Sequence, residues 1–511
     1  MLKGGESEMK EYSYLFTVIM PVYNAEEYLS EAFDSIVNQS IGFENIQLIL
    51  VNDGSADRSG EICRELQKKY SGNVVYIEKE NGGVSSARNA GIPFIKGRYV
   101  NFLDSDDKWD INAFKAVYDF FEEHYDEADV ASCRVKKFEA SDNWHILDFK
   151  FSKGSRVVDL SDEKKASLVQ SHACTAIIKA EAITEADRFA ENVKFGEDSM
   201  FINGIILRSL KLGIVPEAVY YYRKRKNQSS ATQTQTASAD YYSASPRAYY
   251  GFLTEKSREL YNEVVPYIQN VLLYDIGWRV REAPSEAVLS SKELYENYCE
   301  LMKSYLNLID EKHIVSNRVH KRIGYKTALI RLRDGTDLFS ETHFDKDDKA
   351  VFYKDMRLLR LQGSHKLCYI NKCKIRVNPE TKKSVLILEG LIAKWVFDCC
   401  KDEEVDFVIR VGKKKKYKAV RKDYELIKDE NFFGENNRYD FFRKKIVLDD
   451  YLAEKDKVRA ELCLRFSGKS YAITVNYGEG VNTDKEGKLY NNLAVICKSS
   501  GVIIRKKEVE A

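Results

Sequence analysis

The residues best suited to chemistry form a short acidic segment, Asp104, Ser105, Asp106 and Asp107, which directly follows the apolar run at 99–103. Carboxylates this close together repel one another, and a bound cation relieves the repulsion. Hard oxygen ligands at this density suit Mg²⁺ or Mn²⁺, which would bridge to phosphate oxygens. The segment therefore predicts a divalent metal site, and a solvated acidic turn is the alternative.

A second pair of carboxylates, Glu197 and Asp198, follows Gly196 at the start of an expected helix. A carboxylate that faces a cleft from this position could act as a general base and deprotonate a hydroxyl group. The alternative is structural, because acidic side chains also interact favourably with the N-terminal end of a helix dipole.

Three earlier turns carry residues suited to a nucleotide. In the first, Pro21 and Tyr23 could receive a base, and Asn24 can cap the helix that follows. The second contains Asp53, which could bond to a base or ribose. The third places Arg88 in the first turn of a helix, where a guanidinium and the helix N-terminus suit a diphosphate. None of these turns matches a dinucleotide fingerprint or a Walker loop, and each alone could be an ordinary turn.

The elements that position these residues alternate between strands and helices in the first part of the chain. Expected strands are 16–20, 46–52, 74–78, 99–103 and 128–133, and expected helices are 26–39, 58–70, 85–96 and 111–124. This alternation predicts an α/β fold with a mostly parallel sheet flanked by helices. Ligands of such sheets bind outside the carboxyl ends of the strands, where the turns above lie.

The ordered segments TVIMPVYN, ILVNDGS, NGGVSSARN and FLDSDD resemble the nucleotide-sugar-binding half of the family 2 glycosyltransferases, which have the GT-A fold. The resemblance covers about residues 14–230. It implies an inverting, metal-dependent transferase that uses a nucleotide-activated sugar, with a UDP-sugar favoured. The implied nucleotide-sugar-binding residues are Pro21, Tyr23, Asp53, Asn81, Arg88, Asp104 and Ser105. Asp104 and Asp106 would form the DxD pair, with Asp106 the firmer ligand of Mn²⁺ or Mg²⁺, and Asp198 would be the base in preference to Glu197.

The segment YYYRKRKNQSS at 220–230 is cationic. Arg223 or Arg225 could fold over the diphosphate as a lid when the donor binds, and a solvated basic loop is the alternative. His172 lies in an apolar context, and we assign it no role because a single histidine is usually structural.

The change in composition beyond this segment predicts three parts. Residues 1–235 form the GT-A catalytic domain, 236–345 a helical linker region, and 346–511 a β-rich, sandwich-like accessory domain for acceptor binding or oligomerisation. The run GKKKKYK at 412–418 reads as a solvated hairpin tip, or as a contact for anionic lipid.

The overall composition excludes several classes of protein. The 80 Lys and Arg residues nearly balance the 79 Asp and Glu residues, so we expect no nucleic-acid partner. The ten cysteines include no CxxC pair and are expected to be reduced thiols. With no signal peptide or apolar run of membrane-spanning length, the chain is expected to be cytoplasmic, with peripheral contact at the inner face of the membrane left open.

The β-rich region looks similar to domains that accompany bacterial wall-polymer and teichoic-acid-type transferases, which favours a glycan or polyol-phosphate polymer as acceptor. Two alternatives are a sugar- or polymer-binding scaffold with a degenerate transferase domain, and a sugar-phosphate nucleotidyltransferase. The first is weakened by the presence of both acidic pairs. The second should carry a glycine-rich N-terminal phosphate loop, which the first turn does not supply.

Overall fold

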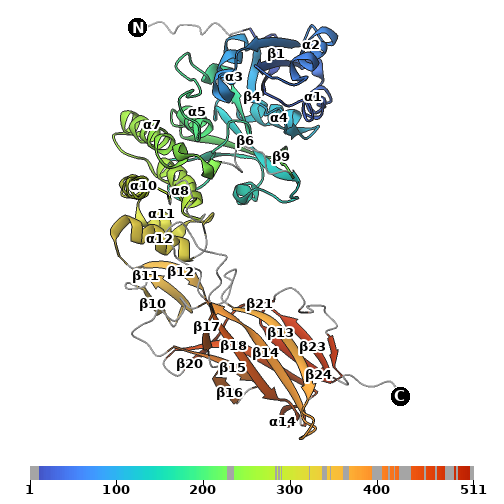
Figure 1. Ribbon diagram of the computed structural model, residues 1–511, viewed down its shortest axis with the longest axis vertical. Helices are drawn as coiled ribbons and strands as arrows, with labels where there is room; N and C mark the ends of the chain where they lie inside the picture. Colours follow the sequence, from blue (N-terminus) through green and yellow to red (C-terminus); the bar gives the residue numbers. More distant parts are fainter. Residues whose placement is uncertain are drawn as a thin grey trace, which may run out of the picture. The chain divides into compact units, whose positions relative to one another are not determined.

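The first strand, β1 (Tyr14–Val22), lies between β2 (Ile46–Asp53) and β4 (Gly97–Phe102) and runs parallel to both (Figure 1). β3 (Val74–Lys79) extends this parallel group beyond β2. Every residue of β2 is buried, as are the last seven of β1. These continuous apolar runs are typical of parallel strands that are covered on both faces.

The computed structural model divides into two compact units, Met1–Ile276 with Ser285–His313, and Gly277–Pro284 with Ile314–Ala511. It describes residues 11–226, 235–281, 285, 288, 290–320, 323–336, 342–345, 347–360, 368–393, 405–412, 415–418, 421–424, 439–453, 456–466, 469–477, 481, 488–490 and 493–506. The Ser/Thr/Gln-rich stretch after the cationic segment lies mostly outside these residues. None of the described helices is long and apolar enough to cross a membrane.

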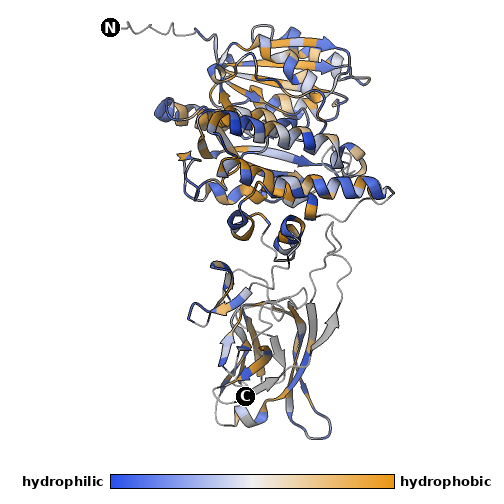
Figure 2. Cartoon of the chain, turned by 90° about the vertical axis from the view of Figure 1, so that its left-hand side faces the viewer, coloured by the Kyte–Doolittle hydropathy of each residue, from blue (hydrophilic) through white to orange (hydrophobic). Residues whose placement is uncertain are grey.

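Four helices connect the strands of the parallel group and the acidic turn. They are α1 (Leu29–Val37), α2 (Ser59–Lys69), α3 (Gly83–Gly91) and α4 (Ala113–His124). In α1 the buried residues are Leu29, Ala32, Phe33 and Ile36, which recur at the spacing of one helical face. Figure 2 shows hydrophilic and hydrophobic residues side by side along the helices of the chain, as expected for helices with one face against a core.

The rest of the first sheet is mixed. β8 (Ala176–Lys179) lies antiparallel between β4 and β6 (Val130–Glu139), and β9 (Lys211–Lys224) then runs parallel to β6. The short strands β5 (Lys108–Trp109) and β7 (Arg156–Asp159) pair antiparallel with β9, which gives the order β3-β2-β1-β4-β8-β6-β9-β5. The expected α/β sheet is confirmed, and it is parallel in its first half and mixed in its second.

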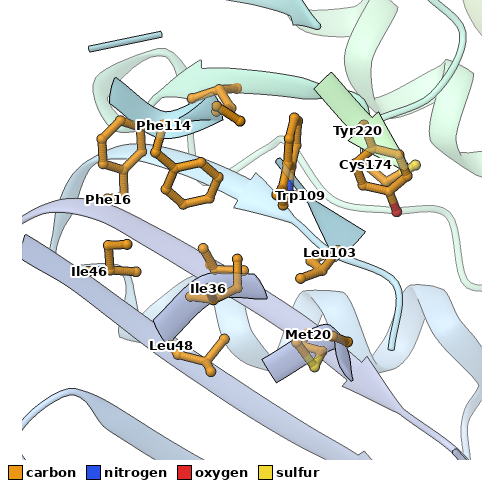
Figure 3. Packing of buried hydrophobic residues seen from close by; sticks show 14 of the residues in the cluster. Phe16, Met20, Ile36, Ile46, Leu48, Leu103, Trp109, Phe114, Cys174 and Tyr220 are labelled. Atoms are coloured by element: carbon orange, nitrogen blue, oxygen red, sulfur yellow. The ribbon is translucent and has the colours of Figure 1, made fainter. Parts of the chain in front are cut away.

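Aromatic side chains pack together in the hydrophobic core of the first sheet (Figure 3). Phe16 stacks on Phe114 at 4.7 Å, and Trp109 meets Tyr220 edge to face at 4.9 Å between ring centroids. The indole of Trp109 donates a hydrogen bond of 3.0 Å to the buried side chain of Asn101. Trp109 lies two residues after Asp107, so its packing and its hydrogen bond hold the end of the acidic turn in one position.

Helices that follow the sheet pack onto α5 (Glu197–Ile206), the helix that begins with the second acidic pair. The Tyr249 hydroxyl donates to Ser199 at 2.6 Å, and the Tyr267 hydroxyl donates to Asn203 at 2.6 Å. Among the described residues from 235 to 345, the helices are α7 (Ala244–Tyr261), α8 (Pro266–Arg281), α10 (Lys292–Leu306), α11 (Glu311–Ser316) and α12 (Ile323–Asp334). The expected helical character of this region is therefore confirmed.

The described residues of the second unit form three sheets of mainly antiparallel strands. The three-stranded sheet comprises β10 (Thr342–Asp345), β11 (Ala350–Tyr353) and β12 (Met356–Arg360). The five-stranded sheet comprises β13 (Cys368–Val377), β14 (Ser384–Ala393), β17 (Arg421–Tyr424), β18 (Tyr439–Val447) and β21 (Val475–Tyr477). The seven-stranded sheet comprises β15 (Val405–Val411), β16 (Lys415–Lys418), β19 (Lys457–Phe466), β20 (Lys469–Ala472), β22 (Lys488–Tyr490), β23 (Leu493–Lys498) and β24 (Gly501–Lys506).

The two larger sheets of this unit contact each other through Phe407 and Phe442, whose ring centroids are 4.8 Å apart. A ring-to-ring contact between the inner faces of two sheets is the packing expected of a sandwich. The lysine-rich segment lies at a hairpin, because β15 pairs with β16 from Val411 opposite Lys415 onward. The hairpin prediction is confirmed, while 413–414 and the lysine side chains lie outside the described residues.

Candidate active site

The acidic turn after β4 separates its carboxylates into two kinds. Asp107 is buried, and its carboxylate accepts hydrogen bonds of 2.7 Å from the Tyr220 hydroxyl and from the backbone N–H of Arg223. Burial, together with the charge of Asp106, raises the pKa of Asp107 well above its usual value. The side chains of Asp104 and Asp106 keep 30% and 21% of their exposure. Asp107 therefore holds the turn against β9, while Asp104 and Asp106 remain partly exposed.

Arg88 joins the two acidic pairs that the sequence places far apart. Its guanidinium is buried and donates hydrogen bonds of 2.8 Å to Asp104 and of 2.8 Å to Asp198. The Cζ atom of Arg88 lies 5.1 Å from the centroid of the Phe189 ring. Burial alone would lower the pKa of Arg88, but the charges of Asp198 and Asp104 outweigh it and raise that pKa. Arg88 is thus a permanent cation at the centre of the site.

The second acidic pair begins α5 directly after Gly196, whose φ of 102° is in the left-handed region that favours glycine. A carboxylate oxygen of Glu197 lies 3.7 Å from the Arg88 guanidinium. Burial and the neighbouring charge of Asp198 raise the pKa of Glu197 to about 7. Burial also raises the pKa of Asp198, while Arg88 acts in the opposite direction. Both carboxylates are thus more basic than carboxylates in water.

The two arginines at the end of β9, Arg223 within the strand and Arg225 directly after it, differ in what they contact. Arg225 donates hydrogen bonds of 2.6 Å and 3.0 Å to the Asp106 carboxylate. Arg223 instead donates to the backbone oxygen of Asp106 at 2.7 Å and forms ion pairs with Glu139, at 2.8 Å, and with Glu31. Burial raises the pKa of Asp106, as does the charge of Asp104, and Arg225 opposes this rise. Arg225 therefore holds one member of the DxD pair in this structure.

Asp53 is buried at the end of β2, where it organises the turn before α3. Its carboxylate accepts from Lys79 at 2.7 Å and from the backbone N–H groups of Gly82, at 3.0 Å, and Gly83, at 2.8 Å. Gly54 has a φ of 71° and packs against the backbone of Asn81. Asp53 therefore lies at the expected edge of the sheet, with its oxygen atoms already bonded within the protein.

The first turn interlocks with the second. Asn24 has a φ of 47°, and its side chain accepts a hydrogen bond of 2.8 Å from the backbone N–H of Ala56. Asn24 caps no helix, because α1 begins only at Leu29, so the capping prediction is wrong. Pro21 is buried in the strand, Tyr23 is 54% exposed, and Asn81 and the partly exposed Ser105 lie in their own turns.

Sequence reasoning missed four charged or titratable residues near the site. Glu31 and Glu139 hold Arg223, as described above. His172, to which no role was assigned, lies close enough for Asp198 to raise its pKa against the larger lowering effect of burial. His172 also lines a small pocket with Lys150, whose pKa burial lowers to about 7. No local pattern in the sequence distinguishes these residues, because tertiary packing brings them near the site.

A parallel half-sheet, an acidic turn after its fourth strand and a mixed second half together define the GT-A class of fold. A family model described as glycosyl transferase family 2 matches residues 17–183. The teichoic acid biosynthesis protein GgaA of Bacillus subtilis is 33% identical over 371 residues, which cover 71% of this chain and 78% of GgaA. This chain therefore belongs to glycosyl transferase family 2.

Two further comparisons extend this result. The Bacillus subtilis protein GgaB, also described as a minor teichoic acid biosynthesis protein, is 37% identical over 345 residues. These cover 67% of this chain, which spans only 38% of the length of GgaB. The crystal structure of TarS from S. aureus matches 97% of this chain and 85% of its own with a TM-score of 0.55 and 16% identity, which establishes a shared fold.

Proposed function

We propose that this protein is an inverting, metal-dependent glycosyltransferase that moves a sugar from a UDP-sugar to a hydroxyl group of a teichoic-acid-type polyol-phosphate polymer. The observation that carries the proposal is the contact of Arg88 with both Asp104 and Asp198. Asp104, which we propose to bind metal, and Asp198, which we propose as the base, therefore contact the same buried guanidinium. Such a pair separates the two tasks of glycosyl transfer, which are leaving-group stabilisation and proton removal.

The donor would lie along the turns that follow β1, β2 and β3. The exposed ring of Tyr23 offers a surface for a base, and Asn81 lies beside the turn that Asp53 organises. Because the oxygen atoms of Asp53 already accept three hydrogen bonds, its contribution is to shape this turn and to leave a further acceptor position for the base or ribose.

The DxD pair has the chemistry of a divalent cation site. Asp104 and Asp106 each contact a guanidinium, which indicates that both carboxylates need a positive neighbour. Asp106 and Asp104 would hold Mn²⁺ or Mg²⁺, which would supply positive charge to the departing diphosphate. Arg225 would then leave Asp106 and turn toward the phosphates, whereas Arg223 is anchored by Glu31 and Glu139 and would keep its place. The lid role therefore falls to Arg225.

Asp198 would act as the base. Its carboxylate takes the proton of the acceptor hydroxyl while that oxygen attacks the anomeric carbon and the bond from this carbon to the diphosphate oxygen breaks. Attack from the face opposite the leaving group inverts the anomeric centre. Arg88 favours the ionised form of Asp198, as the base requires, and burial makes that form more basic than a carboxylate in water.

The proposed acceptor class rests on the descriptions of related proteins and not on side-chain contacts in this structure. GgaA and GgaB are both described as minor teichoic acid biosynthesis proteins, and this chain covers most of GgaA. The second unit would bind the polymer or join protomers, with domain boundaries near 235 and 345. Peripheral contact with the inner face of the membrane belongs to the same proposal.

The test is UDP release from a panel of UDP-sugars with poly(glycerol phosphate) or poly(ribitol phosphate) as acceptor, with Mn²⁺ or excess EDTA. Turnover should require the ion. Asp106→Asn should weaken Mn²⁺ and UDP binding together, because the carboxylate that holds the diphosphate through the metal is lost. Asp119→Asn, which changes an exposed carboxylate on α4, is the matched control and should leave both affinities unchanged. Turnover undiminished in EDTA contradicts the proposal.

A further inference from the structure

A cluster of possible metal ligands lies in the first unit, outside the site described above. Glu163 belongs to the turn after β7, and Asp310 and His313 lie at the start of α11. One ligand atom from each of the three lies within 4.8 Å of the other two. The two segments are separate in the sequence, so a shared ion would join them.

The imidazole of His313 supplies an independent sign of a ligand. Its side chain is 7% exposed, and its Nε2 is buried without a hydrogen-bond partner. This nitrogen faces the cluster, 3.8 Å from a carboxylate oxygen of Glu163. Buried polar atoms without a hydrogen-bond partner are rare in folded proteins, and one explanation is that such an atom binds an ion.

The cluster already attracts a cation from within the chain. The Lys312 ammonium contacts Glu163 and lies 3.4 Å from Asp310. The Lys312 side chain is 50% exposed, so it can turn into water and leave the space between the carboxylates. Two carboxylates and one ammonium leave a net negative charge, which a divalent cation would neutralise more fully.

We propose that Glu163, Asp310 and His313 form a Zn²⁺ site that fastens the turn after β7 to α11, with water as the fourth ligand. One imidazole and two carboxylates are ordinary zinc ligands. A tetrahedral zinc ion separates neighbouring ligand atoms by about 3.3 Å, so the 3.8 Å between His313 and Glu163 needs only a small approach.

Zinc binding sets one further requirement on the surroundings. With Nε2 bound to the ion, Nδ1 of His313 carries the proton and needs an acceptor. Nδ1 lies 3.4 Å from the side-chain nitrogen of Asn270, which also donates to the carbonyl oxygen of Pro266. The Asn270 amide must therefore turn its oxygen toward Nδ1 when zinc binds.

The experiment uses the full chain with Asp104→Asn and Asp106→Asn, so that the DxD turn does not bind metal. The chelator-treated protein is titrated with Co²⁺, whose visible absorption reports the coordination geometry, and the bound Co²⁺ is displaced with Zn²⁺. We expect one saturable site, which Glu163→Gln and Asp310→Asn weaken by roughly tenfold or more. Lys312→Met should tighten it, because the competing ammonium is gone.

Matched exposed substitutions control for surface charge. Glu185→Gln and Lys164→Met change the same residue types outside the cluster and should leave the affinity unaltered. Because these variants and the Glu163, Asp310 and Lys312 variants alter exposed side chains, the test does not depend on a buried substitution that could prevent folding. Absence of a saturable Co²⁺ spectrum overturns the proposal. A Co²⁺ affinity that Glu163→Gln, Asp310→Asn and Lys312→Met all leave equal to that of the parent protein also overturns it.

Discussion

The guanidinium of Arg88 contacts carboxylates that lie 16 and 110 positions away along the chain. It is buried, and its side chain is 3% exposed. Removal of one partner from a buried charge network leaves the others uncompensated, which is costly for stability. Variants of Arg88 therefore confound folding with catalysis, and the two acidic pairs give the clearer tests.

Asp198→Asn tests the base directly. It keeps the shape of the side chain and an oxygen to accept from Arg88, but it removes the basic site. Donor affinity should survive, while sugar transfer should fall by about a hundredfold to ten-thousandfold. UDP-sugar binding by calorimetry and UDP release by coupled assay separate the two effects. Transfer at the parental rate with normal donor affinity would show that Asp198 is not the base, and Glu197→Gln would be tested next.

The raised pKa values predict a distinctive pH dependence. A base must be ionised, and burial raises the pKa of Glu197 to about 7 and that of Asp198 above its usual value. Asp198, as the proposed base, must lose its proton to act, so the rate at saturating donor should rise with pH at values above the usual carboxylate range of about 4. Glu197→Gln should move this limb to lower pH. A rate that stays flat from about pH 8 to about pH 5 would contradict the assignment of this pair.

Between elements, Asp107 links the acidic turn to β9. Asp107→Ala would leave the Tyr220 hydroxyl and the Arg223 backbone N–H buried without partners, so we expect a loss of about 2–4 kcal/mol in the free energy of unfolding. Asp107→Asn retains an acceptor for the N–H and a donor for the tyrosine oxygen, and it should cost much less. Urea denaturation measures both. Equal losses in the two variants would argue against the hydrogen-bond explanation.

The parallel half of the sheet could be predicted because its buried strands are long apolar runs, as in β2. The strand β8 has only four residues, AIIK, and its antiparallel position depends on pairing with two distant strands, so no local pattern indicated it. The same limit applied at the site. Asp104 and Asp198 were identified from local motifs, but their link through Arg88 and the nearness of His172 depend on tertiary packing.

At the scale of the whole molecule, the recognised donor turns all lie in the first unit. Residues 1–345 contain the whole first unit and end within the second unit, directly after β10. This fragment should be soluble and bind UDP with Mn²⁺ as the full chain does, while transfer to polymer should fall if the second unit binds the acceptor. Calorimetry and circular dichroism of the truncated and full chains make the comparison. An insoluble product, or loss of UDP affinity, would show that the boundary near 345 or the modular arrangement is wrong.

The antiparallel insertion of β8 also has a consequence for biosynthesis. The segments of the proposed donor turns and of the first acidic turn have been synthesised once the ribosome has passed residue 107, but β8, α5 and β9, which holds the acidic turn through Asp107, are made later. At about 5–20 residues per second, several seconds separate the synthesis of Asp104 from that of Asp198. During that interval Arg88 has only Asp104 as a partner of the pair it finally bridges. The nascent chain can thus contain all four strands of the parallel half of the sheet before it contains Asp198, the proposed base.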